Sequence, residues 1–214
     1  MPSQAYSDYC RNRIDVERLI ESHGELHGGG PGKKGLGHIT RSGVVMLCAA
    51  WELYTESLVV EAVRYLVAKC TLPNQLPLPV QKEIARHVRE SRHELKPLML
   101  SGDGWKQVLI SHAEQSCARI NTPKSAPLKS LYTSLTGFDL LPGSWPCGAA
   151  QLDTFVGIRG DIAHRGRAAD YVKIGELRSY LEMIDAAAKA SDNAVSDHLV
   201  AVTPGGKKPW RITT

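Results

Sequence analysis

The chain has 214 residues, of which 43% are hydrophobic and 22% charged, as is ordinary for a globular protein. Only 6% are aromatic, so alanine, leucine and valine must supply most of the core, and this composition favours helices. The net charge of +4 permits an anionic partner without requiring one. The five cysteines include no C-x-x-C pair, which argues against a disulfide framework and a zinc site.

The pattern of apolar residues and prolines predicts helices along the whole chain. We expect a first helix over 3–22, a glycine-rich loop over 23–38 and a long helix over 39–70 that is apolar on more than one face. Charged residues interrupt this long helix, so we expect it to be buried rather than to span a membrane. Further helices are predicted over 80–97, 104–119, 127–136, 150–165 and 174–199.

These elements predict one all-α domain over residues 1–200, an up-and-down helical bundle with extra short helices. We expect residues 201–214 to form a flexible C-terminal tail. The N-terminus lacks the apolar core of a secretory signal, and the cysteines are expected to be reduced, so we expect a cytoplasmic protein.

The glycine-rich loop only superficially resembles a phosphate-binding loop. That motif needs G-x-x-x-x-G-K-[ST] after a buried strand. Here Gly28 and Gly32 are one residue too close, Lys33 is followed by Lys34, and no strand precedes them. We therefore favour a flexible connection, and a phosphate-loop enzyme is the weakest of the functions considered.

A row of basic residues follows steps of four, three, four and three along the predicted helix 80–97, namely Lys82, Arg86, Arg89, His93 and Lys96. Such an arrangement can track a phosphate backbone. Interleaved glutamates favour the alternative of a solvated face with local ion pairs. The candidate RNA-binding residues of this row are Lys82, Arg86, Arg89 and Lys96, and Arg165 is a further candidate outside the row.

The stretch "GIRGDIAHRG" at 157–166 places Arg159 and His164 on one helix. At about 100° per residue, Arg159 lies on the apolar face, while His164 shares a second stripe with Gly157 and Gly160. The two side chains are then about 140° apart in azimuth and about 7.5 Å apart along the axis. In one chain the arginine and the histidine are therefore too far apart to act closely together. Two such helices related by a two-fold axis would bring two arginines and two histidines into one cleft.

These residue types suit RNA cleavage. Histidine exchanges protons near neutral pH, and arginine holds phosphate oxygens and stabilises developing charge. The RNA 2′-OH supplies a nucleophile that DNA lacks. A structural alternative pairs Arg159 with Glu52 of the long helix and leaves His164 as a favourable cation at a helix end. We expect no metal and no cofactor at this site.

The motif resembles the R-x4-6-H motif of HEPN domains (higher-eukaryote and prokaryote nucleotide-binding domains), and the chain is most similar to the RiboL-PSP-HEPN branch. "HITRSGVVMLCAAWELYTESLVVEA", including "WELY", resembles the second helix of that branch. "NTPKSAPLKSLYTSLTGFD" resembles the segment before the motif, and "KIGELRSYLEMID" the helix after it. The resemblance covers roughly residues 5–199.

The resemblance implies an all-α bundle that commonly forms a symmetric homodimer with the motif helices facing each other. Many members are metal-independent endoribonucleases of toxin, antiphage or RNA-processing systems, and others are inactive binding or dimerisation modules. By position, Arg159 and His164 are the implied catalytic pair.

Two positions depart from the family pattern. Active members often have Asn, His or Asp directly after the motif arginine, whereas this chain has Gly160 and then Asp161. Asp161 is expected either to orient His164 or to pair with Arg165. A branch regulated by a nucleotidyltransferase antitoxin has a tyrosine two residues after the histidine; here Gly166 stands there.

Two functions therefore remain open: a dimeric, metal-independent endoribonuclease, and an inactive dimerisation, RNA-binding or nucleotide-binding module. RNA, a second copy of the chain and an antitoxin or defence-system protein are the expected partners, and no membrane is expected. Glu52 and Asp161 are the expected supporting residues.

Overall fold

The computed structural model describes residues 1–28, 35–139 and 141–211, and within these ranges it contains helices and no strand. The all-α prediction is confirmed. The α-helices are α1 (Gln4–Asn12), α2 (Ile14–His27), α3 (Gly37–Lys69), α4 (Leu78–Arg89), α5 (Gly104–Cys117), α6 (Ser125–Thr136), α7 (Gly148–Arg165) and α8 (Ile174–Val202). Short 3₁₀ helices are η1 (Pro73–Gln75), η2 (Lys96–Leu100), η3 (Leu141–Ser144) and η4 (Gly166–Ala168).

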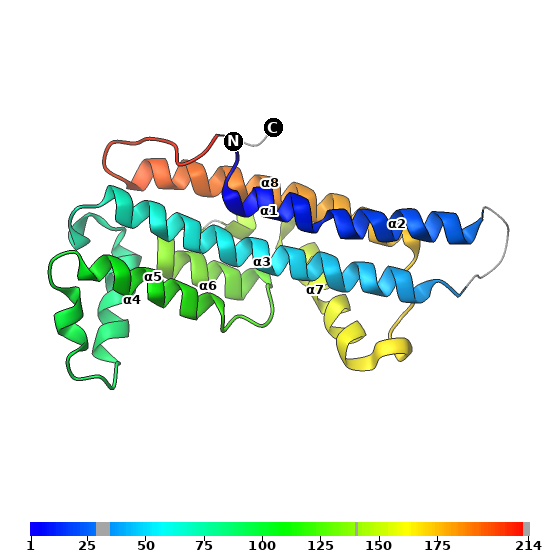
Figure 1. Cartoon of the computed structure of the whole chain (residues 1–214), viewed down its shortest axis with the longest axis horizontal. Coiled ribbons are helices and arrows are strands. Elements are labelled where there is room, and N and C mark those ends of the chain that lie inside the picture. Colours follow the sequence, from blue (N-terminus) through cyan, green and yellow to red (C-terminus); the bar gives the residue numbers. More distant parts are fainter. Residues whose placement is uncertain (29–34, 140, 212–214) are drawn as a thin grey trace.

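Helix α3 is the centre of the bundle. Helices α1, α2 and α8 lie along one side of α3, and α5, α6 and α7 lie along the other, where α4 packs on α5 and α6 (Figure 1). Because neighbours cover it on several sides, α3 buries apolar residues around most of its circumference, including Val44, Leu47, Leu58, Val63 and Leu66.

Large aromatic residues of the core have their polar atoms satisfied. The Tyr54 hydroxyl of α3 donates a hydrogen bond to the Ala188 carbonyl of α8 at 2.7 Å. The Tyr132 hydroxyl of α6 donates to the Thr55 carbonyl at 2.7 Å. These bonds join α3 to the helices on both sides of it, and they remove the cost of burying an unpaired hydroxyl.

By length and composition, α3 is also apolar enough to cross a membrane, with a mean hydropathy of 1.4 over its most apolar window. Of that window, 56% is buried inside the bundle. The central position of α3 accounts for its composition, so a membrane location is not indicated.

Several boundaries differ from the sequence-based prediction, most of all in the first helix and in α4. The first helix is divided at Arg13, whose side chain pairs with Asp185 of α8, and α2 continues to His27 inside the predicted loop. Helix α4 ends at Arg89 instead of reaching residue 97. After Val88 the chain has no buried apolar residue before Trp105, so burial does not stabilise further helical turns.

Within residues 201–211, the predicted C-terminal tail packs against the bundle instead of extending from it. Helix α8 continues to Val202, and Trp210 is buried with its indole N–H donating to the Asp192 carbonyl at 3.1 Å. The Arg211 N–H donates to the Met1 carbonyl at 3.0 Å. The sequence pattern missed this packing because the contacts join the two ends of the chain.

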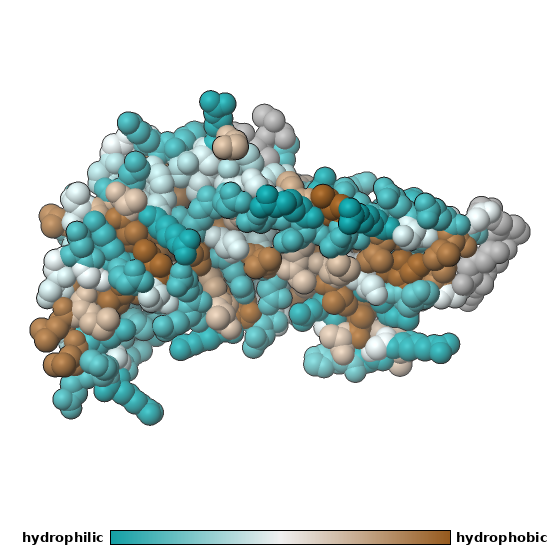
Figure 2. Space-filling model, in the orientation of Figure 1, coloured by the Kyte–Doolittle hydropathy of each residue, from teal (hydrophilic) through white to brown (hydrophobic). Residues whose placement is uncertain are grey.

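The surface of the bundle carries apolar areas as well as polar ones. In the view of Figure 2, apolar surface is visible along the right-hand part of α2 and α3 and at the lower left. Exposed apolar side chains of α3 include Met46 and Leu53, and the connection from α4 to α5 exposes Leu95, Leu98 and Met99.

Candidate active site

Helix α7 carries the arginine and histidine of the motif. It packs on α3 and α6, and its apolar residues Leu152, Phe155, Val156 and Ile162 are buried, whereas Ala163 is exposed. The helix ends at Arg165, and the next residue, Gly166, adopts φ +53°, a left-handed conformation that glycine tolerates best. His164 and Arg165 therefore lie in its last turn.

Arg159 lies at the boundary between α7 and α3. Its guanidinium Nη2 is 3.7 Å from Oε2 of Glu52 on α3, and 30% of the arginine side chain and 20% of the glutamate side chain are exposed. The expected Arg159–Glu52 pair therefore forms. It is only partly buried, so the guanidinium keeps access to solvent.

His164 lies on the outside of the bundle. Its side chain is exposed and makes no hydrogen bond or ion pair within the described parts of the chain. Asp161 and Arg165 are exposed too, and no contact of hydrogen-bond or ion-pair length links Asp161 to either His164 or Arg165. The imidazole is therefore free to meet another molecule.

The glycine stripe, which we define as Gly157 and Gly160, borders open space. A Cβ atom placed on either residue would meet no described atom within 4 Å apart from its chain neighbours and the backbone of its own helix. At the start of the same helix, the Asp153 carboxylate accepts hydrogen bonds from the N–H and the hydroxyl of Ser125, at 2.7 and 2.6 Å. Asp153 thus fixes the first residue of α6 beside α7.

A family model described as RiboL-PSP-HEPN matches residues 11–197 of the chain. The chain belongs to the RiboL-PSP-HEPN family. No curated protein and no solved structure matches it. HEPN domains commonly bind RNA and dimerise, which agrees with an exposed histidine beside an uncovered glycine stripe.

Next to the Arg159–Glu52 pair, the HEPN domain holds two groups that the sequence pattern did not single out. Burial, together with the neighbouring Glu52 charge, raises the pKa of Glu56 to about 7. Burial also raises the pKa of the Cys48 thiol to about 11, despite the nearby Arg159 cation. Cys48 therefore stays protonated and is a poor nucleophile near neutral pH. The sequence feature that could have identified Glu56 is its position one helical turn after Glu52, which places the two carboxylates close together.

Replacing Glu56 by glutamine is expected to stabilise the protein more at about pH 8 than at about pH 5. The pKa of Glu56 rises from 4.5 to about 7 on folding, so its ionisation lowers stability progressively as the pH increases through that range. Because Glu56 is half-buried and partly screened by water, we expect a difference of about 1 kcal/mol. Urea denaturation at both pH values measures it.

The matched control for this experiment is Glu25→Gln on α2, where the carboxylate is exposed. The control is expected to change stability equally at both pH values. An equal change for Glu56→Gln as well would contradict the predicted cost of ionising Glu56.

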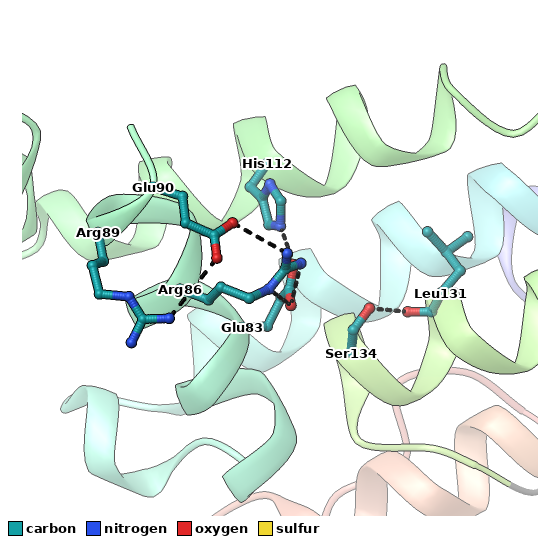
Figure 3. Close-up of polar contacts among 7 residues, drawn as sticks. All are labelled: Glu83, Arg86, Arg89, Glu90, His112, Leu131 and Ser134. Atoms are coloured by element: carbon teal, nitrogen blue, oxygen red, sulfur yellow. Dashed lines mark hydrogen bonds and ion pairs between the residues drawn. The ribbon is translucent and has the colours of Figure 1, made fainter. Parts of the chain in front are cut away.

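The predicted basic row is not one continuous helical stripe. Lys82, Arg86 and Arg89 lie on α4, but Lys96 begins η2 after the helix has ended. Arg86 pairs with Glu83 at 2.6 Å and with Glu90 at 3.3 Å, and Arg89 lies 3.8 Å from Glu90 (Figure 3). Local ion pairs therefore occupy the two arginines, as the alternative interpretation of this row expected.

Among the described residues, no group of three or more His, Cys, Asp or Glu side chains is arranged to hold a metal ion. Within the loop considered for phosphate binding, Gly32, Lys33 and Lys34 lie outside the described residues. The candidate residues with a defined position are thus those of α3, α4, η2 and α7.

Proposed function

We propose that the protein is a dimeric, metal-independent endoribonuclease in which Arg159 and His164 act on the scissile phosphodiester. The observation that carries this proposal is the position of the HEPN motif on α7, with an exposed and unpartnered His164 within the described structure. A toxin, antiphage or RNA-processing role fits this activity, and a dedicated antitoxin or defence-system protein is a proposed partner.

In the proposed reaction, an imidazole removes the proton of the RNA 2′-OH, and the 2′ oxygen forms a bond to phosphorus. The bond from phosphorus to the 5′ oxygen breaks, and that oxygen receives a proton from an imidazolium. The Arg159 guanidinium stabilises the additional negative charge on the phosphate oxygens. The products end in a 2′,3′-cyclic phosphate, or in a 3′-phosphate after hydrolysis, and in a 5′-hydroxyl.

A second copy of the chain is proposed to complete the site. Arg159 points towards Glu52 of α3 whereas His164 points to solvent, so one α7 helix does not direct both groups at one phosphate. A two-fold axis near the glycine stripe supplies a second arginine and a second histidine, which provides one base and one acid. The missing Cβ atoms of Gly157 and Gly160 allow a close helix approach.

Replacing Gly157 and Gly160 together by leucine is expected to preserve the fold and to break the dimer. The space around both residues is open within the chain, and each substitution removes a helix penalty of about 1 kcal/mol. Two leucines would overfill a close helix contact in the dimer. We therefore expect the dissociation constant of the dimer to rise roughly tenfold or more. Sedimentation measures the oligomeric state, and cleavage is expected to fall with it.

Gly175→Leu on α8 is the matched control, because a Cβ at Gly175 also meets nothing within 4 Å. It is expected to leave dimerisation and cleavage unchanged. A double leucine variant that still dimerises like this control would show that the glycine stripe is not at the interface.

Cleavage of structured and single-stranded RNA in the presence of EDTA tests the proposed reaction. The expected result is endonucleolytic cleavage with cyclic phosphate ends. Absence of cleavage over a wide RNA panel, or products with 5′-phosphates, would refute it.

The second candidate function is a catalytically inactive HEPN module that dimerises and binds RNA or a nucleotide. The Arg159–Glu52 pair favours it, because this contact satisfies the arginine charge without any substrate. On this alternative the protein binds RNA without cutting it.

A further inference from the structure

A groove between α4 and α6 lies apart from the motif residues of α7. It has a volume of about 510 Å³, and its lining is mainly apolar. Helix α4 contributes Pro79, Lys82, Glu83 and Arg86, and α6 contributes Ala126, Lys129, Ser130, Thr133 and Ser134.

The charges that face this groove are mainly positive. Lys82 and Lys129, from opposite walls, are exposed and form no ion pair within the described residues. The one carboxylate of the lining, Glu83, is only 11% exposed and is held by Arg86 and by His112, whose Nε2 is 2.8 Å from it (Figure 3). His87 stacks on the His112 ring with centroids 4.0 Å apart. Glu83 is therefore turned inward, and the two lysines determine the charge offered to a ligand.

The groove is connected to the candidate active site through the Asp153–Ser125 contact. Ser125 begins α6, directly before the groove residues Ala126 and Lys129, and Asp153 lies on α7 about 16 Å along the axis from His164. Helices α4, α6 and α7 lie on the same side of α3 (Figure 1). The Asp153–Ser125 hydrogen bonds thus join α7, which carries His164 and the glycine stripe, to the first residue of the helix that carries Lys129.

We propose that this groove binds the phosphate backbone of an RNA strand whose cleaved position lies at α7. Charge complementarity identifies the occupant: unpaired lysines on both walls match a chain of phosphates, and the apolar lining accepts riboses or bases. The proposal rests on the ribonuclease function proposed above, but strand binding is measurable without cleavage.

The test compares Lys82→Gln/Lys129→Gln with the control Lys69→Gln/Lys189→Gln, both in the full chain. Lys69 and Lys189 are exposed and do not line the groove. In a His164→Ala background, the groove variant is expected to bind a long single-stranded RNA roughly tenfold more weakly at low salt. The slope of log affinity against log salt should fall by about 1.4, that is about 0.7 for each lost phosphate contact.

A second measurement uses cleavage by protein with His164 intact. For a long strand the groove variant is expected to raise KM and leave kcat unchanged, because the lysines bind substrate and transition state equally. A dinucleotide, too short to reach the groove, should be cleaved at the unchanged rate. Equal losses on the dinucleotide and the long strand would overturn the proposal, since the lysines would then act on the fold or on the α7 site.

The remaining outcomes separate the two proposals. If the groove variant binds and cleaves like the control, the groove proposal fails and the ribonuclease stands. If strand binding depends on the lysines but the wild type cuts no RNA, the groove proposal stands and the ribonuclease fails. Absence of RNA binding at low salt would overturn the proposal that the groove binds a strand. The proposal would also be overturned if inorganic phosphate displaced the RNA at a concentration equal to that of the phosphates in the strand.

Discussion

Replacing His164 by alanine is expected to lower RNA cleavage by a factor of about 10²–10⁴, the usual contribution of a general acid or base. The loss should appear in kcat, because the imidazole acts in the transition state rather than in strand binding. The fold should be unaffected, since the His164 side chain is exposed and has no partner among the described residues. Initial rates in EDTA, together with circular dichroism, measure both effects.

Arg159→Ala is expected to lower cleavage by about 10²–10³, the typical effect of removing one group that stabilises a developing oxyanion. Arg159→Lys should restore only part of the activity, because an ammonium lacks the planar fork of the guanidinium.

For the His164→Ala variant, the control is His93→Ala at another exposed histidine, which should cleave normally. Equal cleavage by the wild type and by His164→Ala would exclude the proposed role of the imidazole.

Replacing Trp51 by alanine is expected to lower the free energy of unfolding by about 3–5 kcal/mol. Trp51 of α3 is fully buried, packs edge-on against Trp145 with ring centroids 5.6 Å apart, and donates its indole N–H to the Pro123 carbonyl at 3.2 Å. The substitution leaves a cavity and an unpaired carbonyl where the chain enters α6 and α7. The melting temperature should fall by roughly 6–20 °C.

Leu53→Ala is the matched control, because Leu53 lies two residues away on α3 and is 51% exposed. Its stability change should stay below about 1 kcal/mol, as is usual for exposed positions. Similar unfolding free energies for the two variants would contradict the central position of α3. Because Trp51 holds the segments before α6 and α7, we also expect the alanine variant to cleave RNA more slowly at temperatures where it is still folded.

Much of the candidate site was predictable from local sequence. The spacing of Leu152, Phe155 and Val156 defines the buried face of α7, and the same period places Arg159 beside that face and His164 away from it. Glu52 was predictable as a partner because it interrupts an otherwise apolar face of the long helix. These positions follow from helical geometry, which depends only on near neighbours in the sequence.

The basic row and the C-terminal segment were not predictable in the same way. The period of the lysines and arginines suggested a helix to residue 97, but α4 stops where burial stops. Lys129 was not singled out, because its pairing with Lys82 across one groove depends on how α4 packs against α6. Residues 203–211 resemble a solvated tail in composition, yet the Trp210 side chain is buried against parts of the bundle.

The sequence alone thus determined the helical class, the place of α3 as a core helix, and the identity of the arginine–histidine motif. Each of these features depends on the pattern of residues that are close together in the sequence. Tertiary packing decided the rest. It brought Glu52 to within 3.7 Å of Arg159, left His164 and the glycine stripe uncovered, and turned Glu83 inward while Lys82 and Lys129 face a common groove. Such contacts join residues far apart in the chain, and their distances depend on how whole helices pack rather than on any local preference.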